Sequence, residues 1–390
     1  MKNKMNIKCI YLIGYPNVGK TTFMNKLLEY TKSVVIPPHV TTRPARDDDR
    51  GFYKYVTLDE YKKTDFFIES IDSFGRGYGV ENFELEKVSN DKYKYVLINT
   101  SIKNIPLLKK RLANEQGILC AMLHKFPQII ISNNINKYGQ EEIIYRCNEN
   151  IIEQSIIKKE MNFLNSQSCY FIDEFNSIDE MVFDFIINNL AAQMNHGFSK
   201  CVYKFDDYIY KVHRFGYKID MMKLYIKKLD YCSLGYNNHR FIYLNKKEKW
   251  VEIYKETKGK EFDGYNKEIF NKIIDFLDLI DNDFTTNNIV DENIFSYCDS
   301  ILSNKKCFKG KLYINDVIKT YQYCKQKYVG EKFTLSHGDL HPENIIIDAN
   351  NNFKFVDWDE VMYTPLTFDK TVFIFRSLIY TDSLYKINKY

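Results

Sequence analysis

The segment Gly14–Thr21, GYPNVGKT, constrains the fold of this chain more than any other. It follows an apolar stretch at Cys9–Ile13, a predicted strand, and precedes a predicted helix at Lys20–Glu29. The pattern GxxxxGK[ST] between a strand and a helix is typical of a phosphate-binding loop, because its glycines let backbone N–H groups surround an anion. The sequence therefore predicts an α/β domain that binds a nucleotide through this loop.

The loop also indicates chemical roles for its residues. A lysine at the position of Lys20 reaches the β- and γ-phosphates, and a hydroxyl at the position of Thr21 ligates Mg²⁺. We therefore expect ATP or GTP, with Mg²⁺, as the cofactors. The predicted nucleotide-binding residues are Gly14, Asn17, Val18, Gly19, Lys20, Thr21 and Thr22, of which Lys20 is also catalytic and Thr21 is also a metal ligand.

The chain is long enough for two domains, because its 390 residues exceed the size at which one hydrophobic core usually keeps growing. The first half alternates strands and helices, which predicts a parallel, doubly wound sheet. Its further expected elements are strands at Tyr93–Ile98 and Tyr170–Ile172 and helices at Glu141–Asn162 and Ile178–Met194. We place the boundary after this last helix, which gives domains of residues 1–195 and 196–390.

The second half has a different pattern. Hairpin-like strands at Cys201–Phe205 and Tyr208–His213 precede a predicted helix at Asp220–Leu229, and a mostly helical stretch covers 266–327. Two more strands are expected between these helices, at Phe241–Leu244 and Trp250–Tyr254. Strands with one helix, followed by helices, predict an α+β bilobal, protein-kinase-like domain with a small sheet-rich lobe and a larger helical lobe.

The motif His337–Asn344, HGDLHPEN, followed by Phe355–Asp359, FVDWD, is the strongest chemical signal in the sequence. A carboxylate at Asp339, beside an acceptor hydroxyl, accepts or orients the proton of that hydroxyl. Asn344 and Asp357 offer oxygen ligands for the Mg²⁺ that holds the nucleotide phosphates. We therefore predict a phosphotransferase in which Asp339 is catalytic and Asn344 and Asp357 bind the metal.

The loop Thr41–Arg46, TTRPAR, predicts an anion site in the first half, because arginines three residues apart can clamp one phosphate. Together with Gly51–Val56, Phe66–Glu69 and Gly77–Val80, it resembles the guanylate kinase family over about residues 7–192. The resemblance implies phosphorylation of a nucleoside monophosphate. Its implied substrate-binding residues are Arg43, Arg46, Tyr53, Glu69 and Tyr78, whereas His39, Val80 and Asn99 depart from the family at base-reading positions.

A closer resemblance is to the ribose 1,5-bisphosphate phosphokinases, through Tyr78–Val80 and Val96–Ser101. It implies a phosphorylated sugar or an unusual nucleotide as the acceptor. Lid arginines of such kinases stabilise charge on the transferred phosphoryl group, and Arg146, which we predict to be catalytic, is the one that matches. Because guanylate-kinase-like folds also serve as non-catalytic interaction modules, a binding role for this half is the alternative.

The second half resembles the aminoglycoside phosphotransferase, choline kinase and fructosamine kinase superfamily over about residues 197–390. The resemblance places Ser199 in the loop over the ATP phosphates, Lys211 as the phosphate-pairing lysine and Glu252 in the adenine-contacting linker. Asp220 is the expected partner of Lys211. The aspartates of the helical lobe form either a pocket for a cationic acceptor or a solvated helix end; these residues are Asp275, Asp278, Asp281 and Asp283.

The charge balance gives no indication of a nucleic-acid or membrane partner, because 55 Lys and Arg face 51 Asp and Glu and the basic residues are scattered. The nine cysteines form no CxxC pair, which favours free thiols in a reducing compartment. The apolar run near the N-terminus ends within a few residues at the glycine-rich loop, so it predicts neither a signal peptide nor a membrane span. We expect a cytoplasmic protein whose partners are small-molecule phosphate acceptors; the sequence does not indicate an oligomeric state.

These patterns favour a bifunctional, ATP-dependent small-molecule kinase. Its N-terminal site would phosphorylate a phosphosugar or a nucleotide-like phosphate, and its C-terminal site a hydroxyl of a sugar, nucleoside or amino alcohol. In one alternative, the first half is a nucleotide- or partner-binding module that regulates the second. In another, the second half is an aminoglycoside-modifying enzyme.

Overall fold

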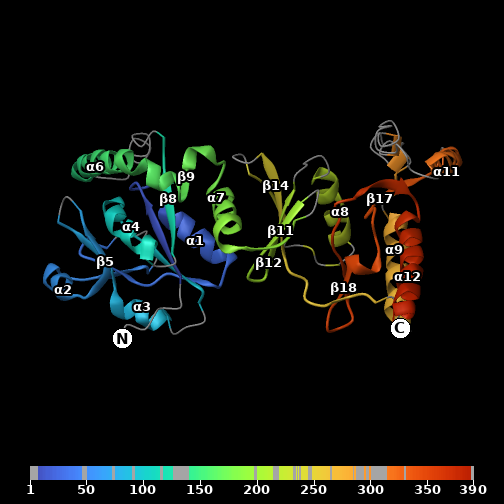
Figure 1. The fold of residues 1–390 in the computed structure, drawn as a ribbon, viewed down its shortest axis with the longest axis horizontal. Coiled ribbons are helices and arrows are strands. Elements are labelled where there is room, and N and C mark those ends of the chain that lie inside the picture. Colours follow the sequence, from blue (N-terminus) through green and yellow to red (C-terminus); the bar gives the residue numbers. More distant parts are fainter. Residues whose placement is uncertain are drawn as a thin grey trace. The chain divides into compact units, whose positions relative to one another are not determined.

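The computed structural model describes residues 8–45, 51–72, 75–89, 93–114, 117–125, 140–196, 200–213, 219–231, 234, 236, 239–244, 248–263, 266–283, 285–286, 294–295, 298–299, 314–328 and 331–387 (Figure 1). Contacts divide the chain into two compact units, one of residues 1–210 with 242–249 and one of residues 211–241 with 250–390. The domain boundary expected after residue 195 stays a prediction.

A five-stranded parallel sheet with the order β2-β7-β1-β8-β9 lies at the centre of the first unit. Its middle strand is β1 (Lys8–Gly14), which pairs with β7 (Tyr95–Asn99) and β8 (Gly117–Leu123). The edge strands are β2 (Val34–Val35) and β9 (Ser168–Phe171). The three inner strands are buried along most of their length, as expected for a parallel sheet that is covered on both faces.

Helices cover the two faces of this sheet (Figure 1). On one side lie α1 (Lys20–Tyr30) and α7 (Ile178–Phe185), which pack against each other through the rings of Phe23 and Phe185, 5.5 Å apart. On the other side lies α4 (Ile105–Asn114). The first unit is therefore the doubly wound parallel sheet that the sequence predicts.

A second sheet of the first unit, with the order β4-β3-β6-β5, was not expected from the sequence pattern. It is formed by β3 (His39–Thr41), β4 (Tyr53–Tyr55), β5 (Phe66–Ile71) and β6 (Gly77–Glu81). Two of its strands have only three residues and β4 has no buried residue, so neither length nor hydrophobic alternation reveals them. The short helices α2 (Leu58–Lys63) and α3 (Asn82–Ser89) accompany this sheet.

The predicted helix at Ile178–Met194 is wrong in its last part. Helix α7 ends at Phe185, one π-helical turn covers Ile186–Leu190, and strand β10 (Ala192–His196) follows. β10 pairs antiparallel with β11 (Lys200–Phe205), and short apolar runs fit a helix and a strand equally well until such a partner is known. The other long helix expected here, α6 (Gln140–Asn165), is confirmed.

The sheet that contains β10 has the order β10-β11-β12-β14-β13. Its remaining strands are β12 (Tyr208–His213), β13 (Arg240–Leu244) and β14 (Lys249–Lys255), and helix α8 (Ile219–Tyr231) follows β12 in the chain. The predicted strands and helix of this region are confirmed. They match the small sheet-rich lobe that we expected.

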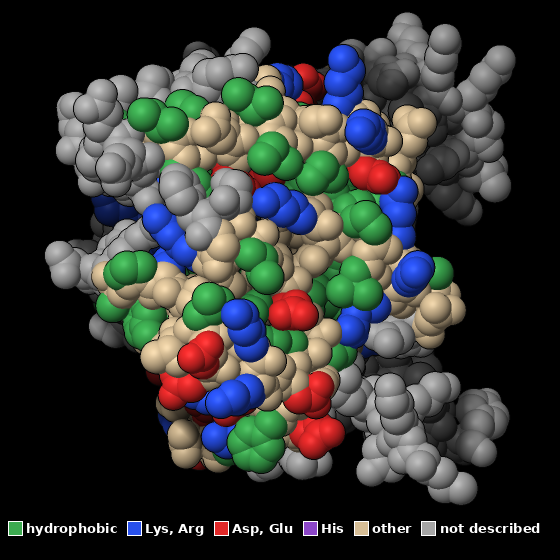
Figure 2. Space-filling view, turned by 90° about the vertical axis from the view of Figure 1, so that its left-hand side faces the viewer, with side chains coloured by type: hydrophobic (Ala, Val, Ile, Leu, Met, Phe, Trp, Pro, Cys, Tyr) green, Lys and Arg blue, Asp and Glu red, His purple; other side chains and the backbone are tan. Residues whose placement is uncertain are grey.

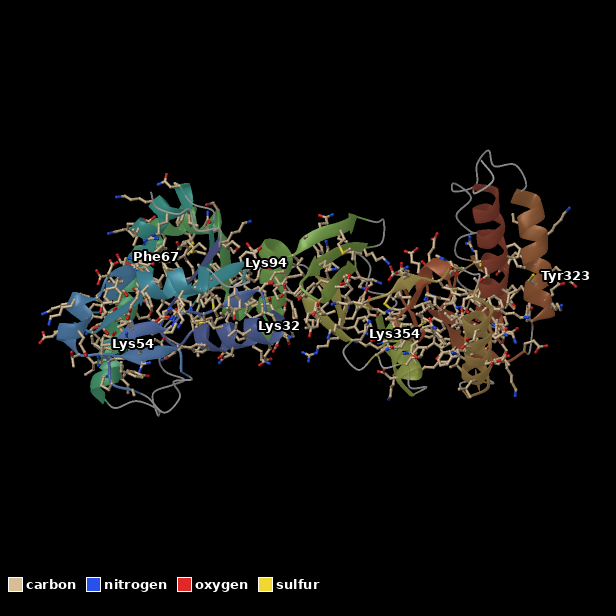
Figure 3. All side chains as sticks on the ribbon, turned by 90° about the horizontal axis from the view of Figure 1, so that it is seen from below. Lys32, Lys54, Phe67, Lys94, Tyr323 and Lys354 are labelled. Atoms are coloured by element: carbon tan, nitrogen blue, oxygen red, sulfur yellow. The ribbon has the colours of Figure 1, made fainter. Side chains whose placement is uncertain are left out.

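The turn between β11 and β12 is held within the first unit by the carboxylate of Asp206. It accepts hydrogen bonds from the hydroxyls of Thr31 and Ser33, and from the backbone N–H groups of Lys32 at 3.0 Å and Ser33 at 3.1 Å. Lys94 Nζ lies 3.9 Å from Asp206 Oδ1, and Lys32 and Lys94 lie close to each other in Figure 3. The loop after the phosphate-binding helix thus binds the tip of a hairpin 174 positions later in the chain.

The second unit contains the helices α9 (Lys267–Asp283), α11 (Ile314–Lys327) and α12 (Phe368–Ile387). α9 and α12 lie side by side (Figure 1), with the rings of Phe270 and Phe373 stacked 5.0 Å apart. The helical stretch expected at 266–327 is confirmed at both of its ends.

Two small three-stranded sheets support the loops of the second unit. One has the order β15-β18-β19, and the other has the order β16-β17-β20. They surround a core that includes Trp358 and Phe355. Their strands are β15 (Lys260–Glu261), β16 (Thr285–Thr286), β17 (Phe333–Ser336), β18 (Ile345–Ile347), β19 (Phe353–Phe355) and β20 (Met362–Pro365).

The surface seen in Figure 2 carries acidic, basic and hydrophobic side chains interspersed with one another. In the described part of the chain, no helix is both long and apolar enough to cross a membrane. The cysteines that the structure describes are free thiols, of which Cys9 and Cys120 are buried.

Candidate nucleotide-binding and phosphotransfer sites

The predicted phosphate-binding loop connects β1 to the first turn of α1. Gly19 precedes the helix with a φ of 96°, a left-handed conformation that glycine adopts without strain. Lys20 Nζ donates hydrogen bonds to the carbonyl oxygens of Gly14 at 2.6 Å and Tyr15 at 2.8 Å. Thr21 and Thr22 are exposed at the start of the helix. The lysine therefore lies against the loop that it is predicted to serve.

Helix α6 turns a buried polar face toward this loop. Arg146 Nη1 donates a hydrogen bond of 2.8 Å to Asn17 Oδ1, so the predicted lid arginine contacts the phosphate-binding loop directly. Glu149, Asn150 and Glu153 are buried with Arg146, at the spacing of three and four residues that places side chains on one face of a helix. Sequence reasoning identified only the arginine of this face.

Glu153 of the same face interacts electrostatically with Lys20. Burial lowers the pKa of Lys20 and raises the pKa of Glu153, and the attraction between the two charges opposes both shifts. The Glu153 Oε2 atom is buried and has no hydrogen-bond partner in the described structure. A carboxylate in this position helps to keep the Lys20 amine protonated.

The predicted acceptor-binding residues lie on the second sheet of the first unit. The guanidinium carbon of buried Arg43 is 4.8 Å from the ring centroid of Tyr53. Tyr78 lies on β6, opposite Thr41 of β3, and Glu69 lies on the next strand with an exposed side chain. Tyr53 of β4 and Tyr78 of β6 thus lie on the two strands that flank β3, and Arg43 follows β3 in the chain, whereas Arg46 falls outside the described residues.

His39, Val80 and Asn99 meet at the base-reading positions of the resembled family. His39 pairs with Val80 across β3 and β6, and His39 Nε2 accepts a hydrogen bond of 3.0 Å from the backbone N–H of Asn99. Because Nε2 is an acceptor, Nδ1 carries the proton and donates to the Pro37 carbonyl oxygen at 2.9 Å. Burial lowers the pKa of His39 to about 4, so the ring is neutral and both nitrogens are occupied within the fold.

In the second unit, Asp339 lies in the loop between β17 and β18. Its Oδ2 atom is 3.5 Å from His341 Nε2, and this interaction holds the pKa of Asp339 below its usual value. The carboxylate is therefore ionised at neutral pH and partly exposed, as required of a group that accepts a proton from a bound hydroxyl.

Asp369, at the start of α12, fixes the backbone just before Asp339. Its Oδ2 accepts from His337 N at 2.6 Å and its Oδ1 from Gly338 N at 3.0 Å. Gly338 has a φ of 85°, and a Cβ atom there would lie 2.0 Å from the Glu360 carbonyl oxygen.

His337 is buried, and its Nε2 atom lies 3.0 Å from the Val356 carbonyl oxygen. Burial lowers the pKa of His337 to about 4. The histidine therefore braces the loop.

The two predicted metal ligands of this site are brought together by the β18–β19 hairpin. Val356 N donates a hydrogen bond of 2.9 Å to the Asn344 carbonyl oxygen, and Asp357 is the next residue. The side-chain amide nitrogen of Asn344 donates to the backbone carbonyl oxygen of Asp339 at 2.9 Å and lies 3.1 Å from His341 Nε2. The side-chain amide oxygen of Asn344 takes no part in these contacts. Asn344 and Asp357 thus provide neighbouring oxygen donors that suit a hard cation.

Lys211 of β12 is buried between carboxylates. Its Nζ atom lies 3.3 Å from Asp357 Oδ1 and 3.9 Å from Glu252 Oε2. The expected pairing with Asp220 is wrong, because that side chain is 93% exposed and bonds Lys223 at 3.3 Å. Glu252 is fully buried within β14, and its contact with the nucleotide stays a prediction; Ser199 falls outside the described residues.

The aspartates of α9 are largely engaged within the fold. Asp278 pairs with Lys370 Nζ at 2.7 Å, and Asp281 is buried and accepts a 2.9 Å hydrogen bond from Thr367 N. Asp275 is exposed, and the side chain of Asp283 falls outside the described residues. These contacts favour the interpretation as ordinary surface and structural charges over a pocket for a cationic acceptor.

Sequence reasoning missed Asp369, Trp358 and Glu153. Trp358 stands within the FVDWD motif, but its role as a donor to Glu252 depends on a partner 106 positions away. Asp369 lies outside any motif, and no local pattern marks its contact with a loop 32 positions earlier in the chain. The buried polar face of α6 could have been predicted from one feature of the sequence. Glu149, Asn150 and Glu153 follow Arg146 at intervals that place all four side chains on one face of a helix.

Comparison with known families agrees with the two halves of the chain. The phosphotransferase enzyme family matches residues 314–384, and the 50S ribosome-binding GTPases match residues 9–100. The N-terminal part is similar to the tRNA modification GTPase MnmE of Christiangramia forsetii, with 27% identity over 141 residues, 34% of this chain and 28% of that protein. It is also similar to the GTPase Der of Thermosipho melanesiensis, with 28% identity over 149 residues, 37% of this chain and 32% of that protein. The chain spans less than a third of the length of these relatives.

Among solved structures, a guanylate kinase from Anaplasma phagocytophilum is similar at 20% identity and a TM-score of 0.30, over 47% of this chain and 85% of that one. The choline kinase LicA from Streptococcus pneumoniae is similar at 14% identity and a TM-score of 0.36, over 50% of this chain and 73% of that one. The C-terminal part therefore resembles phosphotransferases and the N-terminal part resembles P-loop nucleotide-binding proteins.

Proposed function

We propose that this chain is a bifunctional small-molecule kinase. Its C-terminal site transfers a phosphoryl group from a Mg-nucleotide to a hydroxyl, and its N-terminal site acts on a phosphosugar or a nucleotide-like phosphate. The observation that supports the proposal most is the arrangement around one hairpin, where Asp339, Asn344 and Asp357 stand together and Lys211 Nζ lies 3.3 Å from Asp357.

In the C-terminal reaction, the acceptor hydroxyl lies beside Asp339. The carboxylate takes the hydroxyl proton while the acceptor oxygen forms a bond to the γ-phosphorus of the nucleotide. The bond between that phosphorus and the bridging oxygen breaks, and the nucleoside diphosphate leaves with the electron pair. Lys211 pairs with the phosphates, and Asp369 keeps the loop of Asp339 in place through the His337 and Gly338 N–H groups.

The donor atoms of this site fit a magnesium ion. Asn344 and Asp357 would hold it, because their oxygen atoms lie on adjacent strand ends while the Asn344 nitrogen is used for contacts inside the loop. When bound, Mg²⁺ neutralises charge on the nucleotide phosphates. Thr21 would serve the same purpose at the N-terminal site, where its side chain is exposed at the start of α1.

For the N-terminal half, a second function has specific support. The match to GTPases covers residues 9–100, and β7 ends in Asn99, an amide, whose backbone is tied to His39. These observations favour a module that binds, or slowly hydrolyses, a nucleotide and thereby regulates the C-terminal kinase. The contact of Arg146 with Asn17 and the contact of Arg43 with Tyr53 favour phosphoryl transfer instead.

The experiment that tests the proposal measures nucleotide consumption by the wild type and by the Lys20→Ala and Asp339→Asn variants. ATP and GTP are each supplied with Mg²⁺, with and without a panel of sugars, phosphosugars, nucleosides, nucleoside monophosphates, choline and aminoglycosides. Asp339→Asn should lower turnover at the C-terminal site by about 10²–10⁴-fold, as expected for the loss of a positioned base. Nucleotide binding there should persist, because the side chain is replaced by one of equal size.

Two separate acceptor sets, one lost in each variant, are the expected outcome. Activity that depends on Asp339 alone, with acceptor-independent GTP or ATP binding that depends on Lys20, would make the N-terminal half a regulatory module. Undiminished turnover of every acceptor in Asp339→Asn would overturn the assignment of the C-terminal site.

A further inference from the structure

The lysine of the C-terminal nucleotide site is held by a residue of the sheet. In kinases, the equivalent lysine pairs with a glutamate of the neighbouring helix. We propose that Glu252, on strand β14, is the positioning residue of Lys211 in this chain. The inference rests on the function proposed above for the C-terminal site.

Both carboxylate oxygens of Glu252 are engaged, and the side chain is fully buried. Its Oε2 atom lies 3.9 Å from Lys211 Nζ and 3.4 Å from His213 Nε2. Its Oε1 atom accepts a 2.8 Å hydrogen bond from Trp358 Nε1 and lies 3.4 Å from His239 Nε2. A buried carboxylate persists only where such donors and a countercharge surround it, and here the countercharge is Lys211.

Helix α8 provides no alternative among its described side chains. It carries two acids, and Asp220 is 93% exposed and bonded to Lys223. The other acid, Asp230, accepts a hydrogen bond from the backbone N–H of Tyr236. The buried residues of the helix include Met222 and Tyr225, and its buried charged side chain is a lysine, Lys228, not an acid. In this chain, Glu252 on β14, the strand next to β12, makes the pairing that a helix glutamate makes in other kinases.

The same carboxylate links Lys211 to the metal-binding turn. Trp358, which donates to Glu252, follows Asp357 directly in the chain, and Asp357 itself lies 3.3 Å from Lys211 Nζ with a φ of 69°. Glu252 therefore fixes the lysine and the strained turn of the metal ligand relative to each other. Because β14 is bonded into a sheet, this pairing does not depend on the position of helix α8.

A metal ion is a weaker explanation of the same cluster. Ligand atoms of His213, Glu252 and Asp359 lie within 4.8 Å of one another, a spacing that a cation could use. However, the ammonium group of Lys211 lies 3.9 Å from the Glu252 carboxylate and would repel a second cation there. The cluster is therefore best explained as the anionic surroundings of Lys211. Burial by itself would lower the pKa of that amine, but Tyr254, Glu252 and Asp357 around it raise the pKa well above its ordinary value.

The test is Glu252→Gln in the full chain, in a Lys20→Ala background that removes nucleotide binding at the N-terminal site. Glutamine keeps the size of the side chain and an oxygen for Trp358, but it removes the charge that holds Lys211. The dissociation constants of Mg·ATP and Mg·GTP are measured by calorimetry, and KM and kcat are measured with the acceptor found in the panel. We expect weaker nucleotide binding and a fall in turnover of about 10²-fold, approaching Lys211→Met, as for a displaced catalytic group.

Asp220→Asn is the matched control and should behave as the wild type. If Lys211→Met itself leaves nucleotide binding and turnover intact, the proposed function of the C-terminal site is wrong. If Lys211→Met is defective while Glu252→Gln matches the wild type, the site stands and the inference about Glu252 is overturned. Should Glu252→Gln fail to fold, Glu252→Asp is measured instead. Aspartate keeps the negative charge but places it one methylene farther from Lys211. An unaltered KM for the nucleotide in Glu252→Asp would then overturn the inference.

Discussion

His39 and Asn99 occupy positions at which the guanylate kinase family reads a base, yet in this chain they bind each other. Both ring nitrogens of His39 are used, one by Asn99 and one by Pro37. Neither nitrogen is left to recognise a ligand. This agrees with the proposed acceptor, which would be bound through its phosphate by residues such as Arg43 and Tyr53 and not through a base.

The neutral state of His39 has a consequence for stability. Burial lowers its pKa to about 4 in the folded chain, against 6.5 as its ordinary value. Between these values the unfolded chain binds more protons than the folded one, so this residue makes stability fall as the pH falls from about 6.5 to about 4, by up to about 3 kcal/mol. His39→Gln, which keeps an acceptor and a donor but does not titrate, should remove this contribution.

The measurement is urea unfolding of wild type and His39→Gln at several pH values between 4.5 and 7.5. Other groups titrate in this range; burial raises the pKa of Asp369 to about 6, which acts in the opposite direction. The difference between the two proteins isolates His39. A difference that does not change with pH would contradict the buried, neutral imidazole.

At the scale of elements, the start of α12 holds the loop between β17 and β18, which contains Asp339, in place. Asp369 lies in the first turn of the helix and accepts the N–H groups of His337 and Gly338, which no other described side chain is positioned to accept. Asn at this position has one acceptor oxygen, and its amide nitrogen would face a second donor. One buried N–H group would then be left without an acceptor.

We therefore expect Asp369→Asn to reduce the free energy of unfolding by about 1–3 kcal/mol, the usual penalty for a buried unsatisfied donor. Turnover at the C-terminal site should fall with it, while nucleotide affinity, which depends on Lys211, should change little. Asp278→Asn is a suitable control, since its partially exposed pair with Lys370 contributes about 0–1 kcal/mol. Equal effects of the two substitutions on turnover would contradict the role of Asp369.

Elements with strong local signals were predictable, and those defined by distant partners were not. The phosphate-binding loop, α1, α6 and the β11–β12 hairpin follow from glycine placement and hydrophobic pattern. Strand β10 was mistaken for helix because only its pairing with β11 separates the two conformations. The partners of Lys211 and His337 were missed or misassigned for the same reason, since Glu252 and Asp369 lie 41 and 32 positions away.

At the scale of the whole molecule, Asp206 ties the hairpin of the sheet-rich lobe to the loop that follows the phosphate-binding helix. The turn residue has a φ of 51°, which asparagine tolerates about as well as aspartate. Burial alone would raise the pKa of Asp206, but hydrogen bonds from Ser33, Thr31 and the backbone hold it below its ordinary value. Its contribution to stability is present above the unfolded pKa of about 3.9 and is lost as the pH falls through the lower, folded value.

Asp206→Asn should therefore lower the free energy of unfolding at pH 7 by about 1–3 kcal/mol, because an amide cannot accept from all of the donors that the carboxylate binds. The neighbouring substitution Asp207→Asn, in the same turn, serves as the control. Chemical unfolding followed by tyrosine fluorescence and far-UV circular dichroism reports the difference. Identical unfolding midpoints for the two variants would show that the hydrogen bonds of Asp206 do not contribute to stability.

The Asp206 contact also limits where the chain could be divided into two separate polypeptides. A gene split after residue 195 would leave the hydroxyls of Thr31 and Ser33 without their acceptor and would separate β11 from most of β10, one of its two neighbouring strands. As parts of one polypeptide, the two halves are made in a ratio of one to one. Contacts that cross position 195 therefore favour keeping the two halves in a single polypeptide.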